Sequence, residues 1–259
     1  MPTPLSTNER QQWLEELLPL ARAAGRVVMD IYAKAIHPRS KADGSPVTAA
    51  DEQAETLIRA ALKAWTPALP ILAEEAFAAG TRPAPAERFW LVDPLDGTRE
   101  FIARNGEFTI NIALIEDGRP SLGVVFAPAL GRLFAGARGA GAFVEENGQR
   151  RPVQVRTPPA EGLSVLVSRS HSQPAALQDF LAQHRVGTLK PLGSSLKLGL
   201  IAAGEADLYP RLGPTMEWDT AAGQAVLEAA GGRVETRAGE ALRYGKPGLL
   251  NPPFIACGG

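Results

Sequence analysis

Hydrophobic residues recur with helical spacing in the first part of the chain. Between residues 6 and 34 apolar side chains return every three or four positions, and Ser6 and Glu9 fit a capping box, so the pattern predicts one long amphipathic helix. Pro19 is expected to kink this helix. A second helix is predicted from Ala50 to Lys63, because the punctuation TPALP follows it.

The pattern then changes to that of β-strands. The segment ILAEE at 71–75 is predicted to be a short strand running into a loop, and RFWLVD at 88–93 a buried strand that ends at Asp93. From residue 108 to 155 apolar runs alternate with turn sequences, including the hairpin signal Asn147-Gly148. This region is therefore predicted to form a sheet of antiparallel strands.

The proline-rich segment TPPAEG, residues 157–162, indicates a boundary. Beyond it LSVLVSRS is followed by helices predicted at 174–184, in SSLKLGLIAAG and in DTAAGQAVLEAAGG. The order of elements predicts a layered α+β and α/β protein of two lobes, residues 1–157 and 158–259. Ligands are expected where the lobes meet.

Composition and charge exclude several classes of function. With 259 residues and 45% apolar content the chain can form a substantial core, and a formal net charge of -1 gives no basic surface for a nucleic-acid polymer or an anionic membrane. Cys257 is the single cysteine, so no intrachain disulfide forms and a reducing cytosol is the simplest compartment. No targeting pattern and no membrane-spanning segment is found. A soluble, unprocessed cytoplasmic protein is expected.

Five acidic residues stand at unusual places: Asp51, Glu74, Asp93, Asp96 and Asp219. Taken singly, each has an ordinary explanation, since Asp caps helices and precedes Pro and Gly in turns. Asp51 and Asp219 are both candidates for helix caps. Together they gather negative charge at the end of a buried strand, which is unfavourable unless a cation lies beside them.

Magnesium is the cation that suits this pattern, because it prefers carboxylate and carbonyl oxygens. Zinc is disfavoured, since His37, His171 and His184 show no ligand spacing. Two magnesium ions about 4 Å apart that share Asp93 would activate water and stabilise both oxygens of a phosphoryl transfer. Thr98 would then orient the water.

Four motifs, in order along the chain, resemble those of the inositol monophosphatase superfamily: VTAAD at 47–51, AEE at 73–75, DPLDGT at 93–98 and WDTAAG at 218–223. The block WLVDPLDGTREFIARNGEFTINIALI most closely resembles the bacterial 3'(2'),5'-bisphosphate nucleotidases. Those enzymes remove the 3'-phosphate of adenosine 3',5'-bisphosphate, a by-product of sulfate assimilation. The resemblance implies a sandwich of alternating α-β-α-β-α layers, two magnesium ions and inhibition by lithium.

The resemblance also implies a role for each acidic residue. Glu74, Asp93 and the Leu95 carbonyl would hold the first magnesium, and Asp93, Asp96 and Asp219 the second. Asp51 and Thr98 match the water-activating pair, and Asp51 is also the position of a third, weaker metal. The predicted catalytic residues are Asp51, Glu74 and Thr98. Glu75 is expected to support Glu74.

The segment GSSLKLG at 193–199 places hydroxyls and Lys197 at a predicted helix N-terminus, which favours phosphate, although a serine cap with a solvated lysine explains it equally well. The resemblance implies that Ser194, Lys197 and Arg211 grip a second phosphate and that His171 lies near the nucleoside. The predicted substrate-binding residues are Gly97, Thr98, His171, Ser194, Ser195, Lys197, Arg211 and Asp219.

The leading hypothesis is a magnesium-dependent phosphatase acting on adenosine 3',5'-bisphosphate and on its 5'-phosphosulfate analogue. An inositol monophosphatase or broader sugar phosphatase is the alternative within the superfamily, and a non-catalytic nucleotide or metal sensor is the alternative from another class. The intact acidic set argues against the sensor. Dimers occur in the superfamily, so a homodimer is an open expectation, as is peripheral association with the inner membrane.

Overall fold

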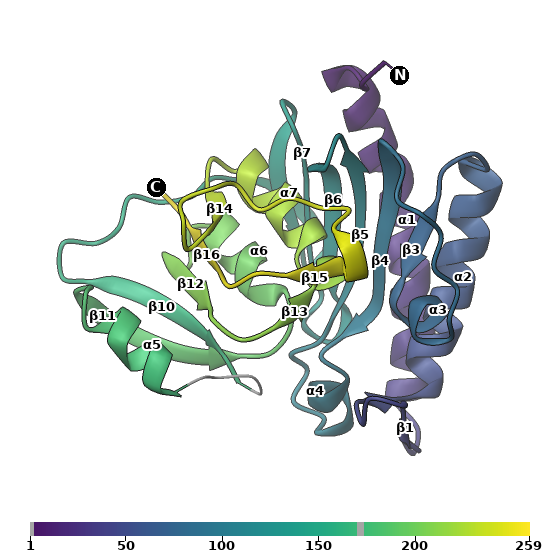
Figure 1. Cartoon of the computed structure of the whole chain (residues 1–259), viewed down its shortest axis with the longest axis horizontal. Coiled ribbons are helices and arrows are strands. Elements are labelled where there is room, and N and C mark those ends of the chain that lie inside the picture. The colour runs from purple at the N-terminus through teal and green to yellow at the C-terminus, as the bar shows by residue number, and fades with distance from the viewer. Residues whose placement is uncertain (1–2, 170–173) are drawn as a thin grey trace.

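Two β-sheets alternate with layers of helices in this protein, whose structure, a computed structural model, describes residues 3–169 and 174–259 (Figure 1). Within these residues the larger sheet has seven strands, in which β3 is parallel to β4 and all other neighbours are antiparallel. In spatial order the strands are β3 (Ile71–Ala73), β4 (Arg88–Asp96), β5 (Thr109–Glu116), β6 (Arg119–Ala127), β7 (Arg132–Ala137), β8 (Gly141–Glu146) and β9 (Gln149–Val153).

The second sheet has five strands in the described residues and mixes parallel and antiparallel pairs. In spatial order they are β11 (Val186–Leu192), β10 (Leu163–Ser168), β12 (Leu208–Arg211), β16 (Phe254–Cys257) and β14 (Arg233–Thr236). Two short ladders complete the strands: β1 (Arg39–Ser40) with β2 (Pro46–Val47), and β13 (Thr215–Met216) with β15 (Leu250–Asn251).

The helices form three layers around the sheets (Figure 1). Helices α1 (Thr7–Tyr32) and α2 (Ala49–Trp65) cover one face of the seven-stranded sheet, α6 (Leu196–Ala202) and α7 (Ala221–Ala229) lie between the sheets, and α5 (Pro174–Leu181) packs on the far face of the five-stranded sheet. The remaining helices are short: α3 (Glu74–Ala78), α4 (Thr98–Ile102), η1 (Pro128–Leu130), η2 (Glu217–Asp219) and η3 (Pro247–Leu249). The predicted α-β-α-β-α sandwich is confirmed.

The central strand β5 shows how the sequence produces this layering. Its side chains alternate between the two faces of the sheet, as those of any strand do. Ile110, Ile112 and Leu114 belong to the apolar cluster under α1 and α2, whereas Ala113 and Ile115 belong to the cluster shared with α7 and the second sheet. A strand covered on both faces carries mostly apolar residues, and five of the eight in this strand are apolar.

Helix α7 approaches the sheet closely because two strands carry glycine beneath it. A β-carbon on Gly123 would lie 2.7 Å from the carbonyl oxygen of Ala222, and one on Gly136 would lie 2.9 Å from the α-carbon of Val226. Real β-carbons do not approach backbone atoms so closely, so only glycine permits this packing. The two glycines thereby set the position of the residues immediately before α7, among them Asp219.

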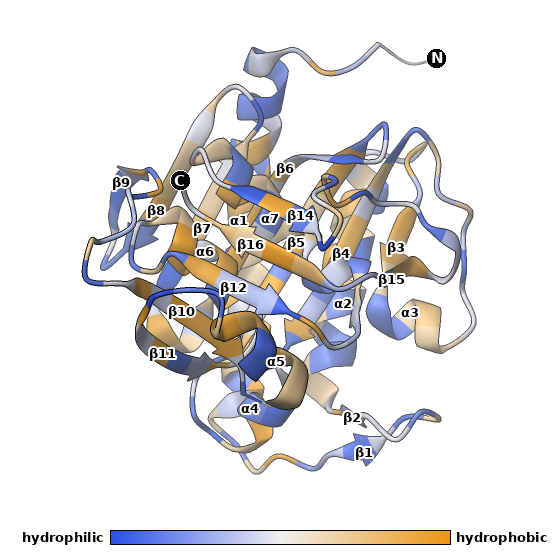
Figure 2. Cartoon of the chain, turned by 60° about the vertical axis from the view of Figure 1, so that its left-hand side comes forward, coloured by the Kyte–Doolittle hydropathy of each residue, from blue (hydrophilic) through white to orange (hydrophobic). Residues whose placement is uncertain are grey.

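The free edge of the seven-stranded sheet at β9 is polar. Arg150 and Arg151 are exposed there, and Pro152 lacks an N–H group to offer a further strand. Figure 2 shows β9 and β1 as mostly hydrophilic, in contrast to the hydrophobic strands β3 and β10. Charged residues and proline at a sheet edge disfavour the addition of strands from other molecules.

Several predicted boundaries differ from the structure. Helix α1 has the predicted capping box at Ser6 and Glu9 and runs through Pro19 as one helix. The segment after β3 is the helix α3 rather than a loop, and β4 continues past Asp93 to Asp96. Helix α7 begins at Ala221 after Thr220, so Asp219 is not its N-cap.

The division into lobes 1–157 and 158–259 stays a prediction, since a single apolar cluster contains residues of both sheets. None of the helices within the described residues has the combination of length and apolar character that crossing a lipid bilayer requires.

Candidate active site

A β-bulge in β4 brings Asp93 and Asp96 to the same side of the sheet. Two residues three positions apart in a regular strand point to opposite faces. Here Asp93 pairs with Asn111 and Asp96 with Thr109, so three steps along β4 match two along β5. The extra residue restores both carboxylates to the face that looks toward α7 and the second sheet. Pro94, which has no N–H group, lies inside the bulge.

Glu74 and Asp219 reach the same place from different elements. Strand β3 runs parallel to β4 with Ala73 opposite Val92, so Glu74, the first residue of α3, emerges at the level of Asp93. Asp219 closes the short helix η2, which packs against β4 and β5, and its Oδ2 accepts the Met216 N–H at 2.8 Å. Four acidic residues spread over 146 positions therefore converge.

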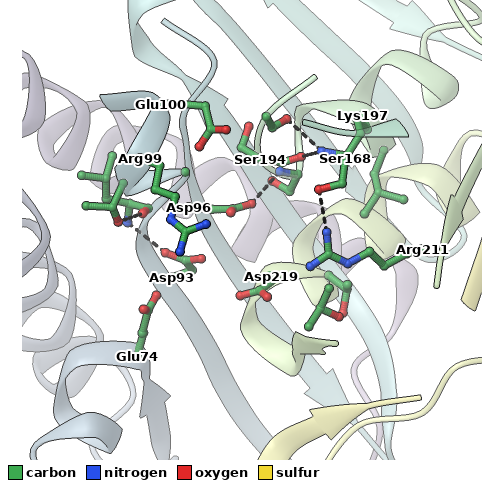
Figure 3. A pocket seen from close by; sticks show the side chains of 18 of the residues that line it. Glu74, Asp93, Asp96, Arg99, Glu100, Ser168, Ser194, Lys197, Arg211 and Asp219 are labelled. Atoms are coloured by element: carbon green, nitrogen blue, oxygen red, sulfur yellow. Dashed lines mark hydrogen bonds between the residues drawn. The ribbon is translucent and has the colours of Figure 1, made fainter. Parts of the chain in front are cut away.

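They face one cavity of about 180 Å³ (Figure 3). Its lining contains eleven of the residues predicted for the site: Glu74, Asp93, Leu95, Asp96, Gly97, Thr98, Ser194, Ser195, Lys197, Arg211 and Asp219. Asp51 lies behind the wall, where its Oδ1 accepts the Thr98 hydroxyl at 3.0 Å. His171 lies outside the described residues.

The buried carboxylates of the cavity repel one another. Burial, followed by the charges of neighbouring carboxylates such as Glu74 and Asp96, raises the pKa of both Asp93 and Asp219 well above the ordinary value. Burial likewise raises the pKa of Asp96 to about 6, although the nearby Lys197 opposes this. Such a group of acids is stabilised in its charged form by a cation between its members.

The lining of the cavity is rich in the oxygen donors that hard divalent cations prefer. Among the described residues five carboxylates and three cationic side chains line the cavity, which leaves an excess of negative charge: Glu74, Asp93, Asp96, Glu100 and Asp219 against Arg99, Lys197 and Arg211. In the part of the chain that the structure describes, no group of three or more acidic, imidazole or thiol side chains is arranged so that it could hold a metal ion by itself. Magnesium does not require one, since it usually takes one or two carboxylates and keeps several waters.

Asp51 and Thr98 form the pair that the motifs predicted to activate water. Asp51 is also the third residue of α2, and its Oδ2 accepts both the backbone N–H and the hydroxyl of the N-cap Thr48 at 2.7 Å. Asp51 is thus the N3 residue of a capping box rather than the cap itself, and it uses Oδ2 for Thr48 and Oδ1 for Thr98. Burial raises the pKa of Asp51, despite its hydrogen bonds to Thr48 and Thr98.

The other end of the cavity is basic, but its helix terminus differs from the prediction. Helix α6 begins at Leu196, and the Ser195 N–H donates to Asp96 Oδ2 at 2.5 Å instead of being free for a phosphate. Lys197 is buried rather than solvated, and its amine donates to the carbonyl oxygens of Leu192, Gly193 and Ser194. Burial lowers the pKa of Lys197 to about 8, with Asp96 opposing the shift.

Arg211 projects into the same end from β12. Its Nη1 donates to the Ser168 hydroxyl at 2.8 Å and its Nη2 to the Pro214 carbonyl at 2.6 Å. Its buried Nε has no hydrogen-bond partner among the described residues. Arg211 is therefore held in place by the protein, and these bonds use only one N–H of each Nη.

Sequence reasoning missed several residues around the site. The Lys41 amine lies 2.7 Å from Glu74 Oε1 and 2.6 Å from Glu75 Oε1, and the Glu55 carboxylate accepts the N–H groups of Glu75 and Ala76. Although burial opposes it, the charge of Glu74 raises the pKa of Lys41. Neither Lys41 nor Glu55 lies in a sequence motif that would have identified it.

Asn111 was also missed, although a signal was present. It is a single amide in the apolar run TINIALI, and its Oδ1 accepts the Ser195 hydroxyl at 2.6 Å. The Ser195 hydroxyl also lies 2.9 Å from Thr109 Oγ1. A buried polar side chain in an otherwise apolar strand needs such partners, and here they join β5 to the loop before α6.

Comparisons with known proteins agree with this geometry. The model of the inositol monophosphatase family matches residues 9–255. The 3'(2'),5'-bisphosphate nucleotidase CysQ of Escherichia coli (strain K12) is 48% identical over 244 residues, which cover 93% of this chain and 98% of that protein. CysQ of Haemophilus influenzae is 32% identical over 249 residues, covering 95% and 92%.

Solved structures give the same result. The crystal structure of CysQ from Bacteroides thetaiotaomicron aligns with a TM-score of 0.80 and 36% identity, covering 96% of this chain and 97% of that one. An inositol monophosphatase from Anabaena aligns with a TM-score of 0.76 and 28% identity, covering 96% and 91%.

Proposed function

The chain belongs to the inositol monophosphatase family, and on that premise we propose that it is a 3'(2'),5'-bisphosphate nucleotidase. The substrate would be adenosine 3',5'-bisphosphate, from which the 3'-phosphate is removed, together with its 5'-phosphosulfate analogue. The observation that carries the proposal is the two-ended cavity, with four carboxylates at one end and Lys197 and Arg211 at the other. A molecule bearing two phosphates matches both ends.

In this proposal magnesium occupies the acidic end. Glu74, Asp93 and the Leu95 carbonyl would hold one ion, and Asp93, Asp96 and Asp219 a second. Asp51 would lie beside a third, weaker ion. When bound, these ions supply Lewis-acid stabilisation of the phosphoryl oxygens and lower the pKa of a coordinated water.

The protein's own part in the reaction begins with the Asp51–Thr98 pair. The Thr98 hydroxyl donates to Asp51 Oδ1, so its lone pairs are directed away from Asp51 and are able to accept a hydrogen bond from the attacking water. As the water oxygen bonds to phosphorus and the bond to the 3'-oxygen breaks, the proton of the water passes through Thr98 toward Asp51, and the 3'-oxygen takes up a proton from solvent to give the free 3'-hydroxyl. The raised pKa of Asp51 suits that role.

The basic end would bind the phosphate that does not react. The charges of Arg211 and Lys197 would attract it, and Ser194, which adopts a left-handed backbone conformation with φ 46°, lines the cavity with them. The Lys197 amine already donates to three carbonyl oxygens, so we assign it a role through charge and through shaping the loop.

A substrate panel tests the proposal. Phosphate release from adenosine 3',5'-bisphosphate, inositol 1-phosphate and fructose 1,6-bisphosphate would be measured with magnesium present. We expect the bisphosphate nucleotide to give the highest kcat/KM. A preference for the inositol or sugar ester would assign the chain to another activity of the family, and absence of turnover on all three would favour a sensor.

Substitutions at the basic end sharpen that test. Arg211→Ala should lower kcat/KM for adenosine 3',5'-bisphosphate by roughly 10- to 100-fold, because a charge-assisted contact of about 1.5–3 kcal/mol is lost. Activity on adenosine 3'-phosphate, which lacks the second phosphate, should change much less. Equal losses on both substrates would reject this assignment of Arg211.

We also propose that the enzyme acts in the cytoplasm, where the thiol of Cys257 would stay reduced. Cell fractionation with detection of the tagged full chain tests this, and recovery mainly with inner-membrane vesicles would contradict it.

A further inference from the structure

One basic residue of the cavity wall has its whole side chain available for a ligand. In the described residues three cationic side chains line the cavity: Arg99, Lys197 and Arg211. Lys197 is engaged by three carbonyl oxygens, and Arg211 by Ser168 and Pro214. The Arg99 side chain makes no hydrogen bond, ion pair or ring contact within residues 3–169 and 174–259.

Arg99 is placed by a rigid piece of backbone. It follows Thr98 in the first turn of α4, where its carbonyl accepts the Ala103 N–H at 2.9 Å and the Thr98 hydroxyl is bound to Asp51. Gly97, with φ 93°, makes the turn that starts this helix. The α-carbon of Arg99 is thus fixed beside the acidic end of the cavity, while the side chain stays exposed.

Its guanidinium group is directed toward that end. Figure 3 shows it extending toward Asp93 and Asp96, opposite to the side from which Arg211 enters. Yet Arg99 forms no ion pair with a carboxylate of the described residues. A planar guanidinium with five free N–H donors can bind two oxygens of one phosphate in parallel, which a lysine amine cannot do.

We propose that Arg99 binds two non-bridging oxygens of the phosphate that is removed. This inference rests on the proposed function, because it places the reacting phosphate at the acidic end of the cavity. It assigns Arg99 a different task from Arg211: one arginine holds the phosphate that leaves, and the other holds the phosphate that stays. Positive charge on the transferred group also stabilises the negative charge that develops there during phosphoryl transfer.

The inference predicts a pattern of activity loss that substitution of a residue binding the second, non-reacting phosphate would not give. Every substrate carries the reacting phosphate, so loss of Arg99 should impair substrates with one or two phosphates alike. Inorganic phosphate, the product, should bind to the same position. Arg99→Lys keeps the charge but loses the paired donors and should lie between wild type and Arg99→Ala.

The experiment compares the wild-type chain with Arg99→Ala, Arg99→Lys and Arg26→Ala, an exposed arginine of α1 that does not line the cavity. We expect Arg99→Ala to raise the inhibition constant of inorganic phosphate and to lower kcat/KM for adenosine 3',5'-bisphosphate and adenosine 3'-phosphate, each by roughly 10- to 100-fold. An unchanged inhibition constant, or a loss confined to the two-phosphate substrate, would overturn the inference.

A binding measurement separates this inference from the proposed function. With magnesium present, inorganic phosphate should raise the Tm of the wild type and of Arg26→Ala, and should raise that of Arg99→Ala distinctly less at the same concentration. Should the wild type prove inactive on every phosphate ester, the proposed function would fail. The Tm shifts would still decide whether Arg99 binds phosphate, and equal shifts in all variants would refute it.

Discussion

At the scale of single residues, the site depends on one extra residue in one strand. Without the bulge at Pro94, Asp93 and Asp96 would face opposite sides of the sheet, and one of them would be buried under α1 and α2 with no partner. A carboxylate in that position would be strongly destabilising. The segment DPLD therefore determines the local backbone conformation as well as supplying carboxylates to the site.

The charge of Asp93 should be essential for turnover and dispensable for folding. Asp93→Asn is expected to lower kcat by roughly 100-fold or more, since it removes the carboxylate that two cations would share. The Tm should stay equal or rise, because Asp93 is buried among like charges. Steady-state kinetics and a thermal melt measure both.

Asp30→Asn, which changes an exposed aspartate of α1, serves as the control. Asp93→Asn with nearly wild-type kcat would contradict shared metal ligation by Asp93.

Sequence analysis identified those cavity residues that lie in motifs recognisable from a short stretch of the chain. Asp93, Asp96, Thr98 and Asp219 lie in short motifs whose spacing is visible along the chain. Lys41 and Glu55 remained hidden, because each acts through a contact with α3 that only the packing of α2 and the β1–β2 hairpin creates. A charged residue in a loop or on a helix face has no local mark of such a partner.

At the scale of elements, the predictions succeeded for long or strongly apolar segments and failed for exposed or very short ones. Strand β5 is buried at every position and was predicted, whereas β11 is exposed over most of its length, contains Pro191 and shows no apolar alternation. Helix α4 has only five residues, too few for a helical period. Its start is fixed by the turn at Gly97 instead.

The contact between α7 and the sheet should tolerate no side chain at Gly123. Gly123→Ala is expected to lower the free energy of unfolding by about 1–3 kcal/mol, because the new methyl group would overlap the backbone of Ala222. Urea unfolding measures the loss. Gly258→Ala, whose added β-carbon would make an ordinary contact of 3.4 Å, should change stability much less. Equal stabilities of the two variants would contradict the proposed close packing.

The buried carboxylate of Glu116 binds the N-terminal segment to the seven-stranded sheet. Glu116 of β5 accepts the Leu5 N–H and ion-pairs with Arg10 and Arg88. Burial opposes its charge, but the hydrogen bonds of Ser121 and Leu5 and the two arginines lower its pKa. The stabilisation from this shift is therefore present above the ordinary pKa and lost as the pH falls through the lower pKa of the folded state.

Glu116→Gln should accordingly destabilise the protein in a pH-dependent way. We expect a loss of roughly 2 kcal/mol at pH 7, and a smaller loss at a pH below the pKa of Glu116 in the folded protein. Urea unfolding at several pH values gives the profile, with Glu240→Gln as an exposed control. A difference that does not depend on pH would show that the charge of Glu116 contributes nothing.

At the scale of the whole molecule, the cavity lies between parts of the chain that are far apart in sequence. The loop before α6 is joined to the first sheet by the bonds from Ser195 to Asp96 and Asn111, and the Gly193 N–H donates to Glu107 Oε2 at 2.8 Å. These bonds connect the loop that carries Ser194 and Ser195 to the sheet that carries Asp93 and Asp96. The separation of the cavity into an acidic and a basic end results from the fold, and no single sequence motif predicted it.

Magnesium should stabilise the whole molecule. Filling the acidic end replaces repulsion between carboxylates by attraction, so Tm is expected to rise with magnesium and to return to its starting value with a chelator. At 100 times the dissociation constant the gain is about 2.7 kcal/mol. Sodium chloride at equal ionic strength controls for screening.

Asp93→Asn should show a clearly reduced rise. A Tm that does not respond to millimolar magnesium would contradict the metal assignment.

The fluorescence of Trp218 should report on structural changes near the cavity. Three of the protein's four tryptophans, Trp13, Trp65 and Trp90, contact one another in the apolar cluster under α1 and α2, with ring centroids 5.0 to 6.2 Å apart. The fourth, Trp218, is adjacent to Asp219, and its ring meets Phe77 of α3 edge to face at 5.3 Å. Any movement of α3 against η2 therefore alters the surroundings of this indole. With the other three replaced by phenylalanine, its emission would follow events in the cavity in real time without an added label.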